Sequence, residues 1–420
     1  MSKPAQSNTA PPPPSPAAAA AAAGKAATRA IRRLTFILLA IEFLDKLVDG
    51  SRQAAWPLVR RDLSLSYTEI GLLHTIPNLI ASIIEPPLGL LGDTRHRRAI
   101  ILTGGVCFAL SMLFISLSTG FLFLLLAFIL FYPASGAFVS LSQAVLMDSN
   151  SSRHEQNMAR WALAGSLGIV AGSLALNITV TVAGASWRAW FGVLCVVSVL
   201  LVLTARRFAF DGPAAAAVAR HEHVNIKRGA LDALRALRRG EVRRWLLLLE
   251  FADLMLDGFH GFLALYFVDV VGLTETRAGV AIAVWTGVGL GGDLLLIPLL
   301  ERVRGLSYLR WSASAMLFLF PAFLLAPGVH AKLVLLGLIG ITNAGWYSIL
   351  KAQLYSAMPA QSGAVLALNN LTGLLGGLVP LALGLVAEQF GLGAMMWLLL
   401  AAPLALLTAI PRREKSFQTW

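Results

Sequence analysis

Apolar residues occur in runs of about 18–25 positions along nearly the whole chain, and short polar breaks separate them. A helix of this length can cross the hydrocarbon core of a bilayer. The pattern therefore predicts an all-α membrane protein with twelve transmembrane helices in two six-helix bundles. The first six are expected near 34–57, 67–91, 99–119, 121–147, 158–183 and 187–205, and the second six near 245–268, 278–300, 308–327, 331–356, 362–386 and 392–410.

Polar segments around these runs divide the chain into domains. Residues 1–33 are rich in proline, alanine and serine, and we predict a disordered cytoplasmic tail. Two bundles follow at 34–205 and 245–410, and residues 411–420 form a cytoplasmic C-terminal tail. A basic linker at 206–244 joins the bundles. We predict an amphipathic helix there that lies on anionic lipid or bridges the halves, with a solvated linker as the alternative.

The composition supports a membrane protein and explains the net charge. Hydrophobic residues make up 57% of the 420 positions, 13% are charged, and the mean hydropathy is +0.72. Of the 34 lysines and arginines, 26 lie in the tails and in loops on the same side, against 5 in the opposite loops. The positive-inside rule predicts a multi-pass protein of the cytoplasmic (inner) membrane with both termini in the cytoplasm. The net charge of +12 thus reflects topology and lipid contact, and we expect no nucleic-acid partner.

One acidic motif occurs twice, at an offset of 208 residues and within apolar surroundings. Its members are Glu42, Asp45, Asp49 and Gly50, which return as Glu250, Asp253, Asp257 and Gly258. On a helix, offsets of three and seven residues place the three carboxylates on one face about 60° wide. Ionisable groups within a membrane are costly and mark a substrate, ion or proton path. Carboxylates this close cannot all ionise at low dielectric, so we predict that the six acids bind protons, substrate or both.

The same offset relates further positions of the two halves. Glu85 returns as Asp293, and Ser140 returns as Ser348. The pattern Leu65-Ser66-x-Thr68-x-x-Gly71 also returns, as Leu273-Thr274-x-Thr276-x-x-Gly279. Acids that recur at fixed spacing in apolar surroundings indicate an internal duplication. A parallel repeat of six helices predicts a substrate site between the halves, near the middle of the bilayer.

The loop after the second predicted span has the sequence Gly89-Leu90-Leu91-Gly92-Asp93-Thr94-Arg95-His96-Arg97-Arg98. It resembles the loop motif of the major facilitator superfamily, in which G-x-L-x-D precedes a short turn and two basic residues, although His96 replaces the usual glycine. The resemblance covers residues 34–410 and implies a twelve-helix transporter. Pro57-Leu58, Leu63-Ser64-Leu65, Ile70-Gly71 and Glu85-Pro86 also resemble the fosmidomycin-resistance-type drug efflux branch, which implies proton-driven export. The double acidic stripe departs from that branch.

The resemblance also implies a cytoplasmic gate. Gly89, Asp93, Arg97 and Arg98 would latch the two halves together in the outward-open state. We expect Asp148 and Arg160, around the loop between the fourth and fifth spans, to be partners of that latch. The alternative for the arginines is a positive cluster that only sets topology.

Further polar residues in the spans are expected to line the cavity or to act as counter-ions. They are Lys46, Arg52, Glu85, Asp293, Lys351, Asn369 and Asn370. Lys46 can pair with Glu42 four residues earlier, but Leu254 replaces it in the second copy. Lys351 is expected to neutralise Asp253 or Asp257, with binding of an anionic substrate group as the alternative. His74 and His260 are weaker candidates for a proton relay or a metal ligand.

Motifs of other protein classes are missing from the sequence. It has no P-loop, HExxH, serine elbow or Rossmann pattern in a suitable context, and Cys107 and Cys195 form no metal motif. We therefore predict no enzyme and no cofactor. The predicted function is proton-coupled export of a small cationic or drug-like solute by a monomeric secondary transporter with alternating access. The alternatives are a divalent metal carrier, an anion:proton symporter for a small metabolite and, from another class, a non-transporting membrane sensor.

Overall fold

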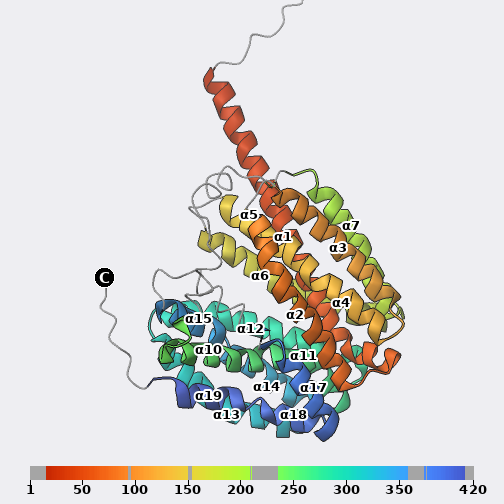
Figure 1. Cartoon of the computed structure of the whole chain (residues 1–420), viewed down its shortest axis with the longest axis vertical. Coiled ribbons are helices and arrows are strands. Elements are labelled where there is room, and N and C mark those ends of the chain that lie inside the picture. The colour runs from red at the N-terminus through yellow and green to blue at the C-terminus, as the bar shows by residue number, and fades with distance from the viewer. Residues whose placement is uncertain are drawn as a thin grey trace, which may run out of the picture.

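The computed structural model describes residues 16–92, 96–149, 154–208, 210, 235–357, 373–374 and 376–411. Within these residues the chain forms two helical bundles, seen in the upper and lower parts of Figure 1. The first contains α1 (Pro16–Leu63), α2 (Tyr67–Gly92), α3 (Arg97–Leu117), α4 (Phe121–Ser135), the π-helix η1 (Gly136–Ser140), α5 (Leu141–Ser149), α6 (His154–Thr181) and α7 (Trp187–Ala205).

The second bundle contains more short elements than the first. They are α10 (Gly240–Asp253), the π-helix η3 (Leu254–Gly258), α11 (Phe259–Asp269), the 3₁₀ turn η4 (Glu275–Arg277), α12 (Gly279–Leu300), α13 (Gly305–Leu325), α14 (Val329–Thr342), α15 (Trp346–Ala357), α17 (Val379–Phe390), α18 (Leu392–Leu398) and α19 (Ala401–Ala409). The acidic motif of the second half thus spans α10 and η3, whereas that of the first half lies in one continuous helix, α1.

The helices follow the predicted spans, and the prediction of an all-α membrane protein with this architecture is confirmed. Eight segments of the described chain are long and apolar enough to cross a membrane: α3, α4–α5, α6, α7, α12 with η4, α13, α14–α15 and α18–α19. The two segments that carry the acidic motifs, α1 and α10–η3–α11, fall outside this set, as does α2. The first part of the eleventh predicted span, residues 362–372, lies outside the described residues.

The N-terminal segment differs from the prediction of disorder up to residue 33. Helix α1 begins at Pro16 and continues without interruption to Leu63, so residues 16–33 extend the first span beyond the bundle (Figure 1). The alanine run at 17–23 explains this difference, because alanine has the highest intrinsic helix propensity. Most of the predicted linker helix, residues 211–234, lies outside the described part of the chain.

Helices α1 and α6 pack closely within the first bundle, because glycines face the partner's backbone. A Cβ atom at Gly50 would overlap the backbone of Ile169, and one at Gly172 would overlap the backbone of Leu47. Small residues allow such close approach of helices in membranes. Ser51 adds a hydrogen bond of 3.1 Å to the carbonyl of Gly172. The acidic motif of the first half therefore lies on a tightly held helix.

Irregular backbone occurs next to acidic side chains at three places. The π-helix η1 begins at Gly136, against which the carboxylate of Glu85 packs. The π-helix η3 contains Asp257. Between α14 and α15 the helix is broken at residues 343–345, where Gly345 has a φ of +73°. Non-helical backbone at membrane depth is tolerated where it is buried in protein or lines a cavity, so these positions point to the functional region.

Candidate substrate cavity

A cavity of about 370 Å³ lies between the two bundles, and four of the six motif acids line it. We call it the central cavity. The first half contributes Asp49, Arg52, Gln53, His74, Asn78 and Tyr132; the second half contributes Glu250, Asp253, Leu254, Asp257, Gly258, His260, Gly261, Gly373, Gly376, Gly377, Val379 and Pro380. The predicted site between the halves therefore exists as a cavity lined by both copies of the motif.

In the first half, Asp49 is neutralised within its own helix. Its carboxylate accepts a hydrogen bond of 2.5 Å from the guanidinium of Arg52, three residues later. Arg52 is 8% exposed and also donates to the hydroxyl of Tyr132 at 3.3 Å. His74 lies 3.4 Å from the same guanidinium through Nδ1. Asp49 and Arg52 therefore form the centre of a buried polar network, as expected for a buried ion pair that persists.

The other two acids of the first copy are also held by protein groups. Asp45 lies 3.3 Å from the ammonium of Lys46 and accepts a bond of 2.6 Å from the hydroxyl of Ser135. Glu42 is 4% exposed, and its carboxylate packs against Gly165 of α6. Neither Glu42 nor Asp45 is among the described residues that line the central cavity. The first copy of the motif thus has a largely internal environment.

Three acids of the second half, Asp253, Asp257 and Asp293, differ from those of the first in their contacts with cations. Within the described residues, no lysine, arginine or histidine forms an ion pair with Asp253, Asp257 or Asp293. The repeat explains this difference, because Leu254 occupies the position of Lys46 and His260 that of Arg52. Carboxylates that line a cavity within a membrane protein without a cationic partner are typical of groups that bind protons or a cationic ligand.

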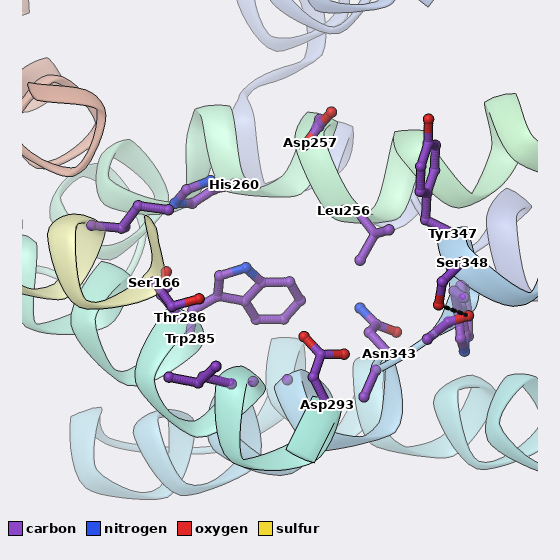
Figure 2. A pocket seen from close by; sticks show the side chains of 17 residues that line it. Ser166, Leu256, Asp257, His260, Trp285, Thr286, Asp293, Asn343, Tyr347 and Ser348 are labelled. Atoms are coloured by element: carbon purple, nitrogen blue, oxygen red, sulfur yellow. Dashed lines mark hydrogen bonds between the residues drawn. The ribbon is translucent and has the colours of Figure 1, made fainter. Parts of the chain in front are cut away.

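A second cavity, of about 390 Å³, lies mainly within the second half and is shown in Figure 2. We call it the annex cavity. It is lined by Ser166 and Ile169 of α6, Leu256, Asp257 and His260 of η3 and α11, Trp285, Thr286, Gly289, Leu290 and Asp293 of α12, and Gly340 and Asn343–Ser348 from the α14–α15 break. Asp257 and His260 line both cavities, so η3 forms the wall between them.

The predicted counter-ion Lys351 has a different contact in the structure. Its ammonium donates to the hydroxyl of Tyr347 at 3.0 Å and lies 4.8 Å from the centre of that ring. It makes no direct ion pair with the described carboxylates, so its role as a counter-ion of Asp253 or Asp257 stays a prediction. Asn369 and Asn370 lie outside the described residues.

The predicted cytoplasmic gate is only partly described. Arg97 is buried, Arg160 is exposed, and Arg98 donates to the carbonyl of Arg206 at 2.7 Å, within the first half. Asp93 lies outside the described residues, and neither the surroundings of Gly89 nor the side chain of Asp148 is described. The latch between the halves therefore stays a prediction.

At the opposite end of the bundles, ion pairs and hydrogen bonds join the halves. Asp269, at the end of α11, accepts bonds of 2.8 Å from Arg60 and from the hydroxyl of Tyr67. Arg61 pairs with Glu275, and the backbone NH of Tyr67 donates to Glu388 at 2.7 Å. Helices α2 and α17 approach closely here, because a Cβ atom at Gly71 would meet the backbone of Pro380. We call this region the closed end.

Sequence analysis missed the closed end, although the repeat contains a signal for it. Asp269 occupies the repeat position of Arg61, so opposite charges stand at equivalent places in the two halves. Equivalent positions of a parallel repeat lie at the same depth around its axis, where such charges can meet. Arg60 and Arg61 are two of the five lysines and arginines counted in the opposite loops, where they served only to indicate membrane topology. Tyr132, Ser135, Trp285 and Asn343 were also missed, because nothing local distinguishes them from other residues in apolar spans.

A metal-binding cluster is not found in the described part of the chain. No three His, Cys, Asp or Glu side chains there are grouped closely enough to hold a metal ion. The donors that line the two cavities are carboxylates, histidines, amides and aromatic groups from several helices. Such a mixed set suits an organic solute better than a rigid cage of metal ligands.

Two repeated bundles around a polar cavity define a multi-pass membrane protein of the transporter class. Comparison with known families agrees: the model of the Major Facilitator Superfamily matches residues 36–381. The chain belongs to this superfamily, which consists of transporters rather than enzymes. Its resemblance to that family, inferred from the loop motif and the repeat, is thereby confirmed.

Individual relatives are distant. The fosmidomycin resistance protein of Escherichia coli (strain K12) is 23% identical over 376 residues, covering 87% of this chain and 90% of that protein. Among solved structures, the nucleoside transporter NupG superposes with a TM-score of 0.71 at 15% identity, over 90% of this chain and 98% of that one. A bacterial homologue of the human lysosomal transporter Spinster, in an inward-facing unoccupied conformation, gives 0.66 at 15% identity, over 91% and 94%. These structural similarities establish the fold.

Proposed function

We propose that this protein is a proton-coupled secondary transporter that exports a small organic cation by alternating access. The observation that carries the proposal is the set of carboxylates on the second half's side of the central cavity. Asp253 and Asp257 line the cavity without an ion-pair partner among the described residues, whereas Asp49 opposite them is neutralised by Arg52. The cavity therefore offers negative charge, or protons in its place.

Competition between protons and a cation provides the coupling. Close carboxylates at low dielectric cannot all be ionised, so some hold protons until a cationic solute replaces them. A cation that enters the cavity displaces protons, and protonation from the other side of the membrane releases the cation. Such exchange at shared carboxylates is antiport without any further machinery.

The proposed topology favours export as the direction of transport. The positive-inside distribution places both termini in the cytoplasm, so the closed end with Arg60 and Asp269 faces outward. A conformation closed on the outer side is the one in which a solute destined for export would bind. The name of the Escherichia coli relative, fosmidomycin resistance protein, is compatible with export.

A second candidate is an anion:proton symporter. Arg52 lies on the wall of the central cavity, and an anion that displaces Asp49 could bind its guanidinium. The cation hypothesis is favoured because Arg52 already pairs with Asp49, while Asp253 and Asp257 across the cavity have no ion pair among the described residues.

Ligand-induced thermal stabilisation of the purified protein, measured at low and at high pH, tests the proposal. We expect organic cations to stabilise the wild type more at high pH, and Asp257→Asn to lose that pH dependence. Asp62→Asn is the matched control, because Asp62 bonds Trp187 and Arg188 within the first half, away from both cavities. If only anions stabilise the protein, and Asp257→Asn responds like the wild type, the symporter becomes the better account.

A further inference from the structure

The annex cavity combines two carboxylates, Asp257 and Asp293, with an aromatic wall. Trp285, Gly289 and Asp293 follow one another at intervals of four along α12, which places them on the same stripe of the helix. The glycine between the two side chains leaves the stripe open. Figure 2 shows the indole of Trp285 and the carboxylate of Asp293 facing the same space.

Asn343 adds an amide that has no hydrogen-bond partner among the described residues. It is 3% exposed, yet neither its side-chain oxygen nor its side-chain nitrogen forms a hydrogen bond with a described residue. Figure 2 shows this amide beside Asp293, at the break between α14 and α15. Buried polar side chains are nearly always hydrogen-bonded, and each exception calls for an explanation. A bound ligand that exchanges hydrogen bonds with the amide supplies one.

We infer that the annex cavity binds the ammonium-bearing aromatic end of the transported solute. The carboxylate of Asp293 pairs with the ammonium, the amide of Asn343 accepts from the same group or from a neighbouring one, and the indole of Trp285 packs against the aromatic body. This inference rests on the proposed transport of organic cations. It separates two roles: Asp293 binds the solute, whereas Asp257, on the wall shared with the central cavity, exchanges protons with it.

The lining of the cavity favours this ligand class over others. No lysine or arginine is among the described residues that line it, so an anion would find no counter-charge. A divalent metal would need several convergent oxygen ligands, and the two carboxylates of this cavity, Asp257 and Asp293, belong to no group of three or more potential metal ligands among the described residues. A volume of about 390 Å³ lies in the range of small-molecule sites, and an aromatic amine would fill much of it.

Binding of 2-phenylethylammonium to the purified full-length protein tests the inference, with neutral N-acetyl-2-phenylethylamine as the uncharged probe. We expect Asp293→Asn to weaken binding of the ammonium about 10- to 100-fold, as for loss of a charge-assisted hydrogen bond, and to change binding of the neutral probe little. Glu85→Gln removes the repeat-related carboxylate, which packs against Gly136 outside the annex cavity. An equal loss in that variant would mean that any missing membrane carboxylate has this effect, and would overturn the inference.

Asn343→Leu provides a test that does not depend on the charge. Because the amide has no protein partner among the described residues, an apolar side chain of similar size should leave the ligand-free melting temperature unchanged or raise it. The same variant should weaken binding of the ammonium probe several-fold. A large loss of stability without a change in affinity would show that Asn343 has a structural role, and would contradict the inference.

The outcomes separate this inference from the proposed function. If Asp293→Asn binds the ammonium normally while Asp257→Asn does not, the annex site is wrong and cation transport stands. If the wild type binds the neutral probe as tightly as the ammonium, and neither variant changes either affinity, both proposals fail. If the wild type binds neither probe, the annex cavity does not take aromatic ammonium groups.

Discussion

The two copies of the acidic motif have the same acids at the same spacing but opposite surroundings. In the first copy, Lys46 lies beside Asp45, Arg52 pairs with Asp49, and Ser135 donates to Asp45. At the equivalent positions of the second copy the chain has Leu254, His260 and Asn343, and Asn343 has no hydrogen-bond partner among the described residues. Asp45 and Asp49 of the first copy thus have cationic partners, whereas Asp253 and Asp257 have no ion pair among the described residues.

The backbones of the two motifs also differ: that of the first copy is regular and tightly packed, and that of the second is irregular. Helix α1 is regular through its motif and packs against α6 with the glycines Gly50 and Gly172. The second motif passes into the π-helix η3, and Gly258 faces the side chains of Leu383 and Leu254 rather than a helix backbone. A π-helix adds a residue to the turn and redirects the side chains around it, which is frequent at functional sites. This difference supports our proposal that the first copy has a structural role while the second binds and exchanges ligands.

The largest effect on transport is expected when a lysine is placed at the position in the second copy that corresponds to Lys46. In Leu254→Lys, the new ammonium would lie within reach of Glu250, Asp253 and Asp257 on the same helical segment and would neutralise the cavity wall. We expect cation transport in proteoliposomes to be lost, while the protein still purifies in folded form with the elution volume of the wild type. Leu254→Met serves as the control for size, and transport that survives Leu254→Lys would show that the negative charge is not required.

Removal of the cation from the first copy should be the largest effect on stability. Arg52→Ala leaves Asp49, whose side chain is 24% exposed, without its partner, and the cost should approach but not exceed the about 3–5 kcal/mol of a fully buried ion pair. His260→Ala, at the equivalent position of the second copy, should cost less than about 1 kcal/mol, because His260 holds no ion pair with a described residue. Unfolding in detergent compares the two variants. Equal losses would contradict the assignment of a structural role to the first copy.

Alanine substitutions of the two motif glycines should differ in their cost to stability, by less than the substitutions of Arg52 and His260. Gly50→Ala places a methyl group in the backbone of Ile169, and such overpacking costs about 1–3 kcal/mol. Gly258→Ala meets the side chains of Leu383, at 3.1 Å, and Leu254, at 3.5 Å, which can move. We expect a lower melting temperature for Gly50→Ala and little change for Gly258→Ala. The reverse order would show that η3, not α1, is the tightly packed element.

The smallest effect on stability is expected at the closed end. Asp269→Asn weakens the bonds from Arg60 and Tyr67, but partly exposed ion pairs contribute only about 0–1 kcal/mol. This small energy still biases the equilibrium between two conformations, by up to about fivefold. A single cysteine placed beside the central cavity should therefore be labelled faster from the outer side in Asp269→Asn. Unchanged labelling would show that the pairs do not hold this end closed.

Sequence patterns predicted much of this structure because membrane spans and repeats are local or periodic signals. Long apolar runs defined the two bundles, and the offset of 208 related Glu42 to Glu250 and Glu85 to Asp293. The central cavity was expected between the halves, and Asp49 and Asp257 do line it. The acidic residues were identifiable because a carboxylate is costly in an apolar span.

Other features depend on packing between distant helices, which one sequence does not display. Arg52 was a candidate counter-ion, but its network with Tyr132 and His74 joins three helices. The annex cavity arises from the helix break at Asn343 and the π-helix η3, and no residue pattern predicted either one. Lys351 was assigned to the motif acids by charge alone, whereas its ammonium bonds the nearby Tyr347.

Cation-driven proton movement in proteoliposomes tests the central claim most directly, in a comparison of Asp257→Asn with the double variant Asp49→Asn/Arg52→Gln. The double variant replaces the ion pair of the first copy by neutral groups of similar shape, a change that is often tolerated. We predict that the double variant retains proton movement when cation is added, and that Asp257→Asn abolishes it. Loss of coupling in the double variant together with normal coupling in Asp257→Asn would contradict the account.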